Sequence, residues 1–180
     1  MTFTRMDEST PEQWMAIAQD SVPYQEEVAD RVLGMLRELD KFFGGFGVSQ
    51  LTHALQTATL AERAGAPEDV VVAALCHDVG KAISLANHPA IAAEILKPYV
   101  SESTYHVVRT HQDFQGRHYY SMLGKDPESR AQYASEPWYA DAERFTDQWD
   151  QAAFDPDYDT LPLEHFEPLV RKVFGEVKIA

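Results

Sequence analysis

The apolar run from Val70 to Cys76 ends directly in two polar residues, His77 and Asp78. A helix that faces only the core would continue with aliphatic residues, and a surface helix would not contain the apolar run that precedes the pair. The sequence therefore places an imidazole and a carboxylate at the edge of a buried segment, where polar groups need partners. We expect the fold to bring further polar side chains to this point.

Helical periodicity dominates the rest of the chain. Apolar residues recur at intervals of three and four, as at Val28, Val32, Met35 and Leu39, and Pro and Gly lie between the periodic segments. These features predict an all-α fold, in which the glycine-rich segment 42–47 forms a loop. We expect a short first helix capped by Thr10, with Pro11 and Gln13 in its first turn, and further helices over residues 24–39, 49–65 and 162–174. Another helix is expected to begin at Pro67 and end at Gly80, one to start near His88 after Asn87, and one to precede His111. Residues 127–154, after the cap residue Asp126, are expected to be mostly helical with a break at Pro137.

The size and composition of the chain fit a single domain over residues 1–180. With 180 residues and 44% hydrophobic side chains, the chain can bury a core without disulfides, and Cys76 is its only cysteine. The apolar run that ends at Cys76 is far shorter than the roughly 20 residues that a membrane span needs. We expect a cytoplasmic protein.

The net charge of −14 argues against partners that are themselves anionic. The chain has 15 Lys and Arg against 29 Asp and Glu, without a local basic patch. Nucleic-acid backbones and anionic membranes would be repelled, so neither is expected as a partner. Most of the acidic excess is attributed to solubility, although it would also help a site that collects divalent cations.

Further histidines accompany the His77–Asp78 pair. His53 belongs to the apolar face of its predicted helix, and His88 begins a helix from which its side chain can turn toward a shared centre. Taken singly, each fits a hydrogen-bonded core histidine better than a metal ligand. Together with His111 and the adjacent pair, they favour a metal site, because imidazoles are the commonest metal ligands and carboxylates accompany them for harder ions.

The order of these residues resembles the HD superfamily of metal-dependent phosphohydrolases, all-α helical bundles named for an adjacent His-Asp pair. His53 precedes His77-Asp78 by twenty-four residues, and His88 and His111 follow at places that look like the third and fourth histidines of the family. The full set, with the late Trp149-Asp150, is most similar to the branch that contains myo-inositol oxygenase and the phosphonate-cleaving oxygenases. The resemblance covers residues 49–166, the expected metal-binding core.

The resemblance implies a role for each matching residue. Asp78 would bridge two metal ions, which in this branch are an Fe(II)/Fe(III) pair. His53, His77 and Asp150 would complete one metal site, and His88 and His111 would hold the other.

Three basic residues are candidates for contact with the substrate. Lys81 matches a position that touches substrate in the inositol enzyme, so Lys81 and Asp78 are the expected catalytic residues; an exposed lysine at a helix end is an almost equal alternative. Arg117 or His118 is expected to add a second contact to an anionic substrate.

The chain departs from the phosphonate enzymes in the loop before the first histidine. Those enzymes have a tyrosine and a glutamate there, where this chain has Phe43 and Phe46. Aromatic faces attract quaternary ammonium groups, so a trimethylated amine is one conceivable substrate tail that these rings would contact. The alternative, slightly favoured, is a hydrophobic lid.

Two enzymatic functions follow from this pattern. The first is a diiron oxygenase that uses O2 to cleave the carbon–phosphorus bond of a small 1-hydroxyphosphonate, either 2-amino-1-hydroxyethylphosphonate or its N-trimethylated analogue. The second is a phosphohydrolase that acts on a nucleotide or small phosphate ester with Mn, Mg or Co. A metal-binding protein without catalysis is the third and least favoured reading.

Other polar residues are given less weight. The alternating acids from Asp155 to Asp159 lack the glycine and the final acid of a calcium loop. Cys76 is expected to pack as a small hydrophobe, and His106 and His165 are expected to be structural or surface residues. Asp113 and Asp147 are the substitutes if one carboxylate ligand is misassigned.

Overall fold

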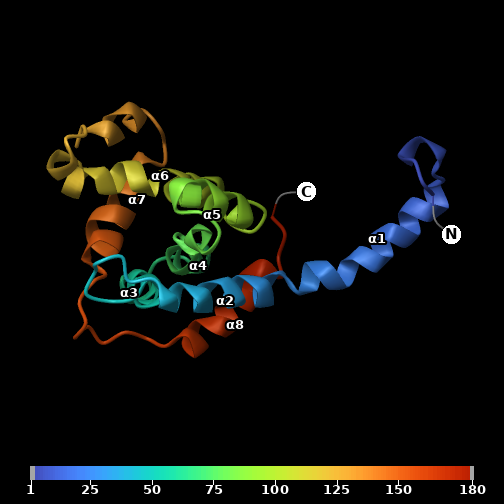
Figure 1. Cartoon of the computed structure of the whole chain (residues 1–180), viewed down its shortest axis with the longest axis horizontal. Helices are drawn as coiled ribbons and strands as arrows, with labels where there is room; N and C mark the ends of the chain where they lie inside the picture. Colours follow the sequence, from blue (N-terminus) through green and yellow to red (C-terminus); the bar gives the residue numbers. More distant parts are fainter. Residues whose placement is uncertain (1–2, 179–180) are drawn as a thin grey trace.

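The computed structural model describes residues 3–178, and within this range it is all-α, as the sequence predicts. One short 3-10 turn precedes the first helix, and further 3-10 turns and one π-helical turn lie between the later helices. The α-helices are α1 (Pro11–Glu26), α2 (Val28–Glu38), α3 (Gln50–Arg63), α4 (Glu68–Cys76), α5 (His88–Leu96), α6 (Glu102–Tyr119), α7 (Tyr139–Arg144) and α8 (Leu163–Phe174) (Figure 1).

Helix α4 forms the centre of the bundle. It packs against α3, α6 and α8, and every residue from Val71 to Cys76 is buried (Figure 1). This packing explains why its sequence is continuously apolar instead of amphipathic, since a helix that is covered on all sides has no face for water. The end of α4 therefore delivers His77 and Asp78 into the interior.

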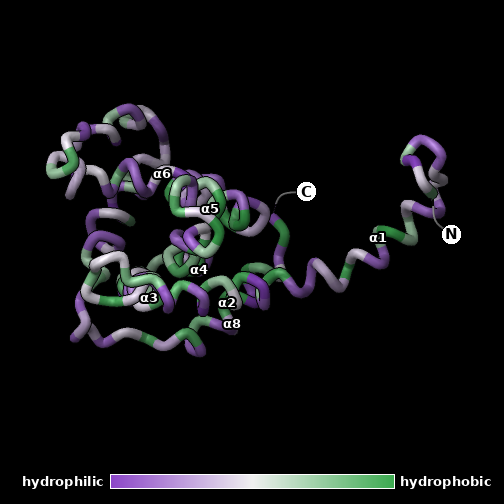
Figure 2. The backbone as a smooth tube through the Cα atoms, in the orientation of Figure 1, coloured by the Kyte–Doolittle hydropathy of each residue, from purple (hydrophilic) through white to green (hydrophobic). Residues whose placement is uncertain are grey.

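Helix α1 extends away from the bundle, with the amino-terminal end of the chain at its far tip (Figures 1 and 2). Thr10 and Gln13 form the predicted capping box, in which Thr10 N donates to Gln13 Oε1 at 2.8 Å. The predicted start of the next helix at residue 24 is wrong, because α1 runs through Pro23 to Glu26 and is not short. None of its residues is buried, and α1 is in contact with α2.

The turn after α4 differs from its prediction. Gly80 does not simply terminate α4; it lies in a 3-10 turn, Val79–Ala82, which follows the end of the helix at Cys76. A Cβ atom at Gly80 would lie only 2.3 Å from the carbonyl oxygen of His88. Glycine is needed here so that the start of α5, which carries His88, can pack against this turn.

The stretch 127–154 is less regular than predicted, although the break near Pro137 is present. It contains a 3-10 turn, Ser129–Tyr133, then α7, a π-helical turn, Phe145–Trp149, and a 3-10 turn, Asp150–Ala152. A π turn holds an extra residue and changes the direction of the side chains that follow it; such turns concentrate at functional sites. Asp150 directly follows this π turn, so the turn determines the direction in which the Asp150 side chain points.

No helix between residues 3 and 178 has the length together with the apolar composition that crossing a bilayer would require.

Candidate metal centre

The fold brings six polar side chains from five parts of the chain into one buried cluster. Two of them are adjacent in the sequence, the other four come from separate elements or turns, and each has a relative exposure of 5% or less. The cluster consists of His53 from α3, His77 and Asp78 from the end of α4, His88 from the start of α5, His111 from α6 and Asp150 from the turn after the π helix.

One part of the cluster is a triad of His53, His77 and Asp150. The Nε2 atoms of His53 and His77 are 3.2 Å apart, and Asp150 Oδ1 lies 3.2 Å from the first and 3.4 Å from the second. Asp78 Oδ2 approaches the same two nitrogens at 3.6 and 3.4 Å. Four potential ligand atoms thus face one point.

The other part of the cluster surrounds the second oxygen of Asp78. Asp78 Oδ1 lies 3.1 Å from His88 Nε2 and 3.5 Å from His111 Nε2. The two oxygens of a single carboxylate therefore face two different pairs of histidines. This arrangement suits a carboxylate that bridges two cations.

Backbone carbonyls fix the tautomer and direction of all four imidazoles. A histidine whose Nδ1–H donates to a carbonyl presents the lone pair of Nε2 as its ligand atom. In each case Nδ1 has a carbonyl oxygen within 3.0 Å. The partners are Ala153 O for His53, Ala74 O for His77, Leu85 O for His88 and Val108 O for His111.

Several ligand atoms of the cluster lack a hydrogen-bond partner among the described residues. Asp78 Oδ1, Asp150 Oδ1 and His111 Nε2 are buried and unpartnered, because the short contacts around Asp78 Oδ1 do not have hydrogen-bond geometry. Buried polar atoms without partners are costly, and metal ions would satisfy all three. Four imidazole nitrogens and two carboxylates suit transition-metal ions better than calcium, which prefers oxygen ligands.

The buried charges shift the pKa values within the cluster. Burial alone would raise the pKa of Asp78 and Asp150, but neighbouring imidazoles outweigh it and hold both pKa values well below the usual range. Burial lowers the pKa of His77, yet the two carboxylates outweigh burial and raise it to about 9. For His111 burial prevails, and its pKa lies below the usual value. Metal binding would therefore displace a proton from His77.

Lys81 contacts the cluster directly. Its Nζ donates to Asp78 Oδ2 at 2.5 Å and to Gln50 Oε1 at 2.6 Å. Gln115 adds a further neutral contact, since its Nε2 donates to Asp150 Oδ2 at 2.7 Å. Neither glutamine is predicted from the sequence as a site residue, although Gln50 lies three residues before His53 and Gln115 four residues after His111, each on the same face of its helix as the histidine.

Aromatic rings cover the outer face of His53. Phe154 stacks on the imidazole with ring centroids 4.2 Å apart, and Phe46 stacks on Phe154 at 4.5 Å. Gln56 anchors this layer, because its side chain hydrogen-bonds the backbone N–H and carbonyl of Asp155. Phe46 therefore reaches the cluster only through Phe154, while Phe43 is 56% exposed in the same loop.

The fold does not bring Arg117 and His118 to the cluster. Arg117 forms an ion pair with Glu128, and His118 Nε2 lies 2.9 Å from Asp147 Oδ1. Asp147 also accepts from Arg130, so it is engaged at the surface of the π turn instead of in the cluster.

The residues expected to be structural, surface or substitute residues lie outside the cluster. Asp113 accepts a hydrogen bond from Tyr133, His106 stacks on Trp138, and His165 contacts Glu62. Cys76 is fully buried, and burial raises the pKa of its thiol to about 12.

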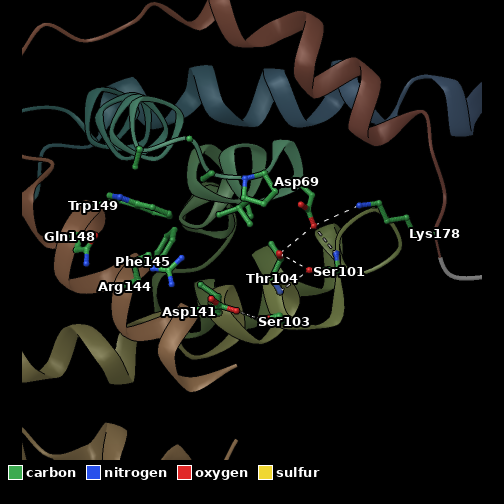
Figure 3. A pocket seen from close by; sticks show the side chains of 17 residues that line it. Asp69, Ser101, Ser103, Thr104, Asp141, Arg144, Phe145, Gln148, Trp149 and Lys178 are labelled. Atoms are coloured by element: carbon green, nitrogen blue, oxygen red, sulfur yellow. Dashed lines mark hydrogen bonds and ion pairs between the residues drawn. The ribbon is translucent and has the colours of Figure 1, made fainter. Parts of the chain in front are cut away.

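A cavity of about 680 Å³ lies apart from the cluster. Figure 3 shows Asp69, Thr104 and Lys178 on one side of it and Arg144 and Trp149 on the other. None of the six clustered residues lines it. The ring of Phe145 lines the cavity and also packs edge-on against His77 with centroids 5.5 Å apart.

Comparison with known proteins agrees with this geometry. A curated relative, (1-hydroxy-2-(trimethylamino)ethyl)phosphonate dioxygenase (glycine-betaine-forming) from Leisingera caerulea, is 46% identical over 44 residues, which make up 24% of this chain and 22% of the relative. The match thus spans about a fifth of the length of that protein. The HD domain family model matches residues 51–146, more than half of the chain. The chain belongs to the HD domain family.

Proposed function

We propose that this HD protein is a dinuclear iron oxygenase that cleaves the carbon–phosphorus bond of a small 1-hydroxyphosphonate. The observation that carries the proposal is the position of Asp78, whose two oxygens face two separate pairs of histidines. The local identity to a phosphonate dioxygenase supports the choice of substrate class. We also propose a single domain over residues 1–180 and a cytoplasmic location, both of which stay predictions from the sequence.

The proposed reaction converts the hydroxyphosphonate and one O2 into a carboxylate, inorganic phosphate and one proton. The C–P bond and the C–H bond of the hydroxyl-bearing carbon break, and the carbon and the phosphorus each gain one oxygen. When bound, the iron pair supplies the capacity to react with O2. His53, His77, Asp78 and Asp150 would hold one ion, and His88 and His111 with Asp78 would hold the other.

The exposure of the cluster indicates the side from which substrate enters. The side chains of His88 and Lys81 are 7% and 17% exposed, whereas those of His53, His77, Asp78, His111 and Asp150 are 1% exposed or less. Substrate would therefore approach the ion held by His88 and His111, which has fewer protein ligands. Lys81 lies on this path, where its ammonium group would neutralise an anionic substrate.

Oxygen uptake is the direct test of the proposal. Protein reconstituted with iron should consume O2 and release phosphate in equal amounts from 2-amino-1-hydroxyethylphosphonate or from its N-trimethylated analogue. The corresponding phosphonate without the hydroxyl group is the control and should give neither signal. Phosphate release without oxygen uptake would contradict the proposal.

A phosphohydrolase remains the second candidate, because the same cluster would suit a pair of Mn, Mg or Co ions. This reaction needs no oxygen. Release of phosphate from a nucleotide or a small phosphate ester under strict anaerobiosis would favour it over the oxygenase.

A further inference from the structure

Gln50 is a buried amide at the edge of the metal cluster. It is the first residue of α3, it is 4% exposed, and it lies one turn before His53 on the same helix face. Its backbone N–H donates to Phe42 O at 2.7 Å, so the start of the helix is held in place. The backbone of Gln50 is therefore held beside the site.

The contact with Lys81 determines which way the Gln50 amide faces. Lys81 has only hydrogen-bond donors, and its Nζ lies 2.6 Å from Gln50 Oε1. A flipped amide would place two donors against each other, so the oxygen must face Lys81. The Nε2 group of Gln50 then points away from Lys81 with two N–H donors.

These donors have no partner among residues 3–178. Gln50 Nε2 is buried and lacks a hydrogen bond, unlike the amide of Gln56 two turns later, which donates to a backbone carbonyl at 2.6 Å. A buried amide without a partner destabilises the fold, because its lost hydration is not replaced. Such a group is retained more readily if a ligand satisfies it.

We propose that Gln50 recognises the anionic group of the substrate by donating hydrogen bonds from its amide nitrogen to a phosphonate oxygen. This inference rests on the proposed function for the identity of the anion. Lys81, held between Gln50 and Asp78, is the one cation that hydrogen-bonds the cluster in the described chain. Gln50 and Lys81 together would form a subsite with one charged and one neutral donor next to the entry side.

Two variants of Gln50 separate recognition from a merely structural role. Gln50→Met removes all hydrogen bonding at similar size, whereas Gln50→Glu keeps an acceptor for Lys81 and removes both donors. Binding of methylphosphonate, which has no hydroxyl group to oxidise, is measured by calorimetry on iron-loaded protein without oxygen. We expect about 10- to 100-fold weaker binding for Gln50→Met and a larger loss for Gln50→Glu.

A merely structural role for Gln50 predicts little loss from the neutral substitution, because Lys81 stays paired with Asp78. If Gln50 only holds Lys81, Gln50→Met should bind methylphosphonate within twofold of the wild type, and that result would overturn the inference. Iron content and thermal midpoint are measured for both variants, so that a folding defect is seen separately. Gln132→Met is the matched control, because this exposed amide donates to Ser129 O, away from the cluster.

The inference and the proposed function fail in different ways. Binding that depends on Gln50, without oxidation of a hydroxyphosphonate, would support the subsite and contradict the oxygenase. Oxidation with a KM that neither variant changes would contradict the subsite and support the oxygenase. Absence of methylphosphonate binding to the wild type would overturn the assignment of the anion.

Discussion

The two carboxylate oxygens of Asp78 face different groups of side chains. One oxygen accepts from Lys81 and faces His53 and His77, and the other faces His88 and His111 without a hydrogen bond. Its charge is compensated in part by the Lys81 ammonium group, and metal ions would complete the compensation. Loss of this carboxylate should therefore affect both groups of histidines together.

Asp78→Ala is expected to abolish iron binding and all activity, because neither group of histidines keeps its shared oxygen ligand. Iron per chain is measured by elemental analysis, with circular dichroism to verify the helical fold. His165→Ala serves as the control, since this histidine lies 42% exposed against Glu62, outside the cluster. Iron content in the Asp78 variant equal to that of the wild type would refute the ligand assignment.

The sequence pointed to the six clustered residues but not to those that surround them. Imidazoles and carboxylates in a fixed order are visible in the sequence, whereas Gln50, Gln115 and Phe154 belong to residue types that occur throughout the chain. Arg117 and His118 are basic residues of the helix that carries His111, but neither reaches the cluster. On an α-helix, residues six and seven positions after His111 are rotated by roughly 240° and 340° about the helix axis. Arg117 therefore faces another side of α6 than His111 does, and His118 contacts Asp147.

At the scale of elements, the π turn Phe145–Trp149 could not be predicted from local sequence. Its residues have ordinary helical propensity, and the wider turn depends on contacts from distant parts of the chain. Arg130 makes one of these contacts: Nη1 donates to both oxygens of Asp147 at 3.0 Å, and Nη2 lies 3.3 Å from Glu143 Oε1. The Arg130 side chain is 11% exposed, so this ion pair is held more firmly than a surface pair.

Arg130→Gln should weaken metal binding by about tenfold, because Asp147 lies three residues before Asp150 and loses the contact that holds the π turn. The measurement is iron loss during titration with a chelator. Arg117→Gln is the matched control; it removes an arginine whose side chain is 47% exposed and which pairs with Glu128 at the surface. Equal resistance to the chelator in wild type and Arg130→Gln would show that the π turn holds Asp150 without this contact.

At the scale of the whole molecule, the fold class follows from the sequence but the position of α1 does not. Helical periodicity was sufficient to predict an all-α fold, and the apolar run 70–76 predicted a buried segment. The capping box at Thr10 and Gln13 correctly predicts where α1 begins, yet a cap stabilises a helix whether or not anything packs against it. The packing of a helix depends on the rest of the chain, and α1 buries none of its residues.

Removal of α1 should therefore leave the metal centre intact. We expect a chain that starts at Val28 to keep its iron content, with a thermal midpoint within about 4 °C of the full chain, since a loss of about 1 kcal/mol shifts a domain of this size by roughly 2–4 °C. Removal of α8 is the contrast, because this shorter helix buries Phe166, Val170 and Phe174 in the core and packs against α4. The chain without α8 should fail to fold. If the chain without α1 also lost its iron, this helix would support the cluster through contacts that the buried core does not reveal.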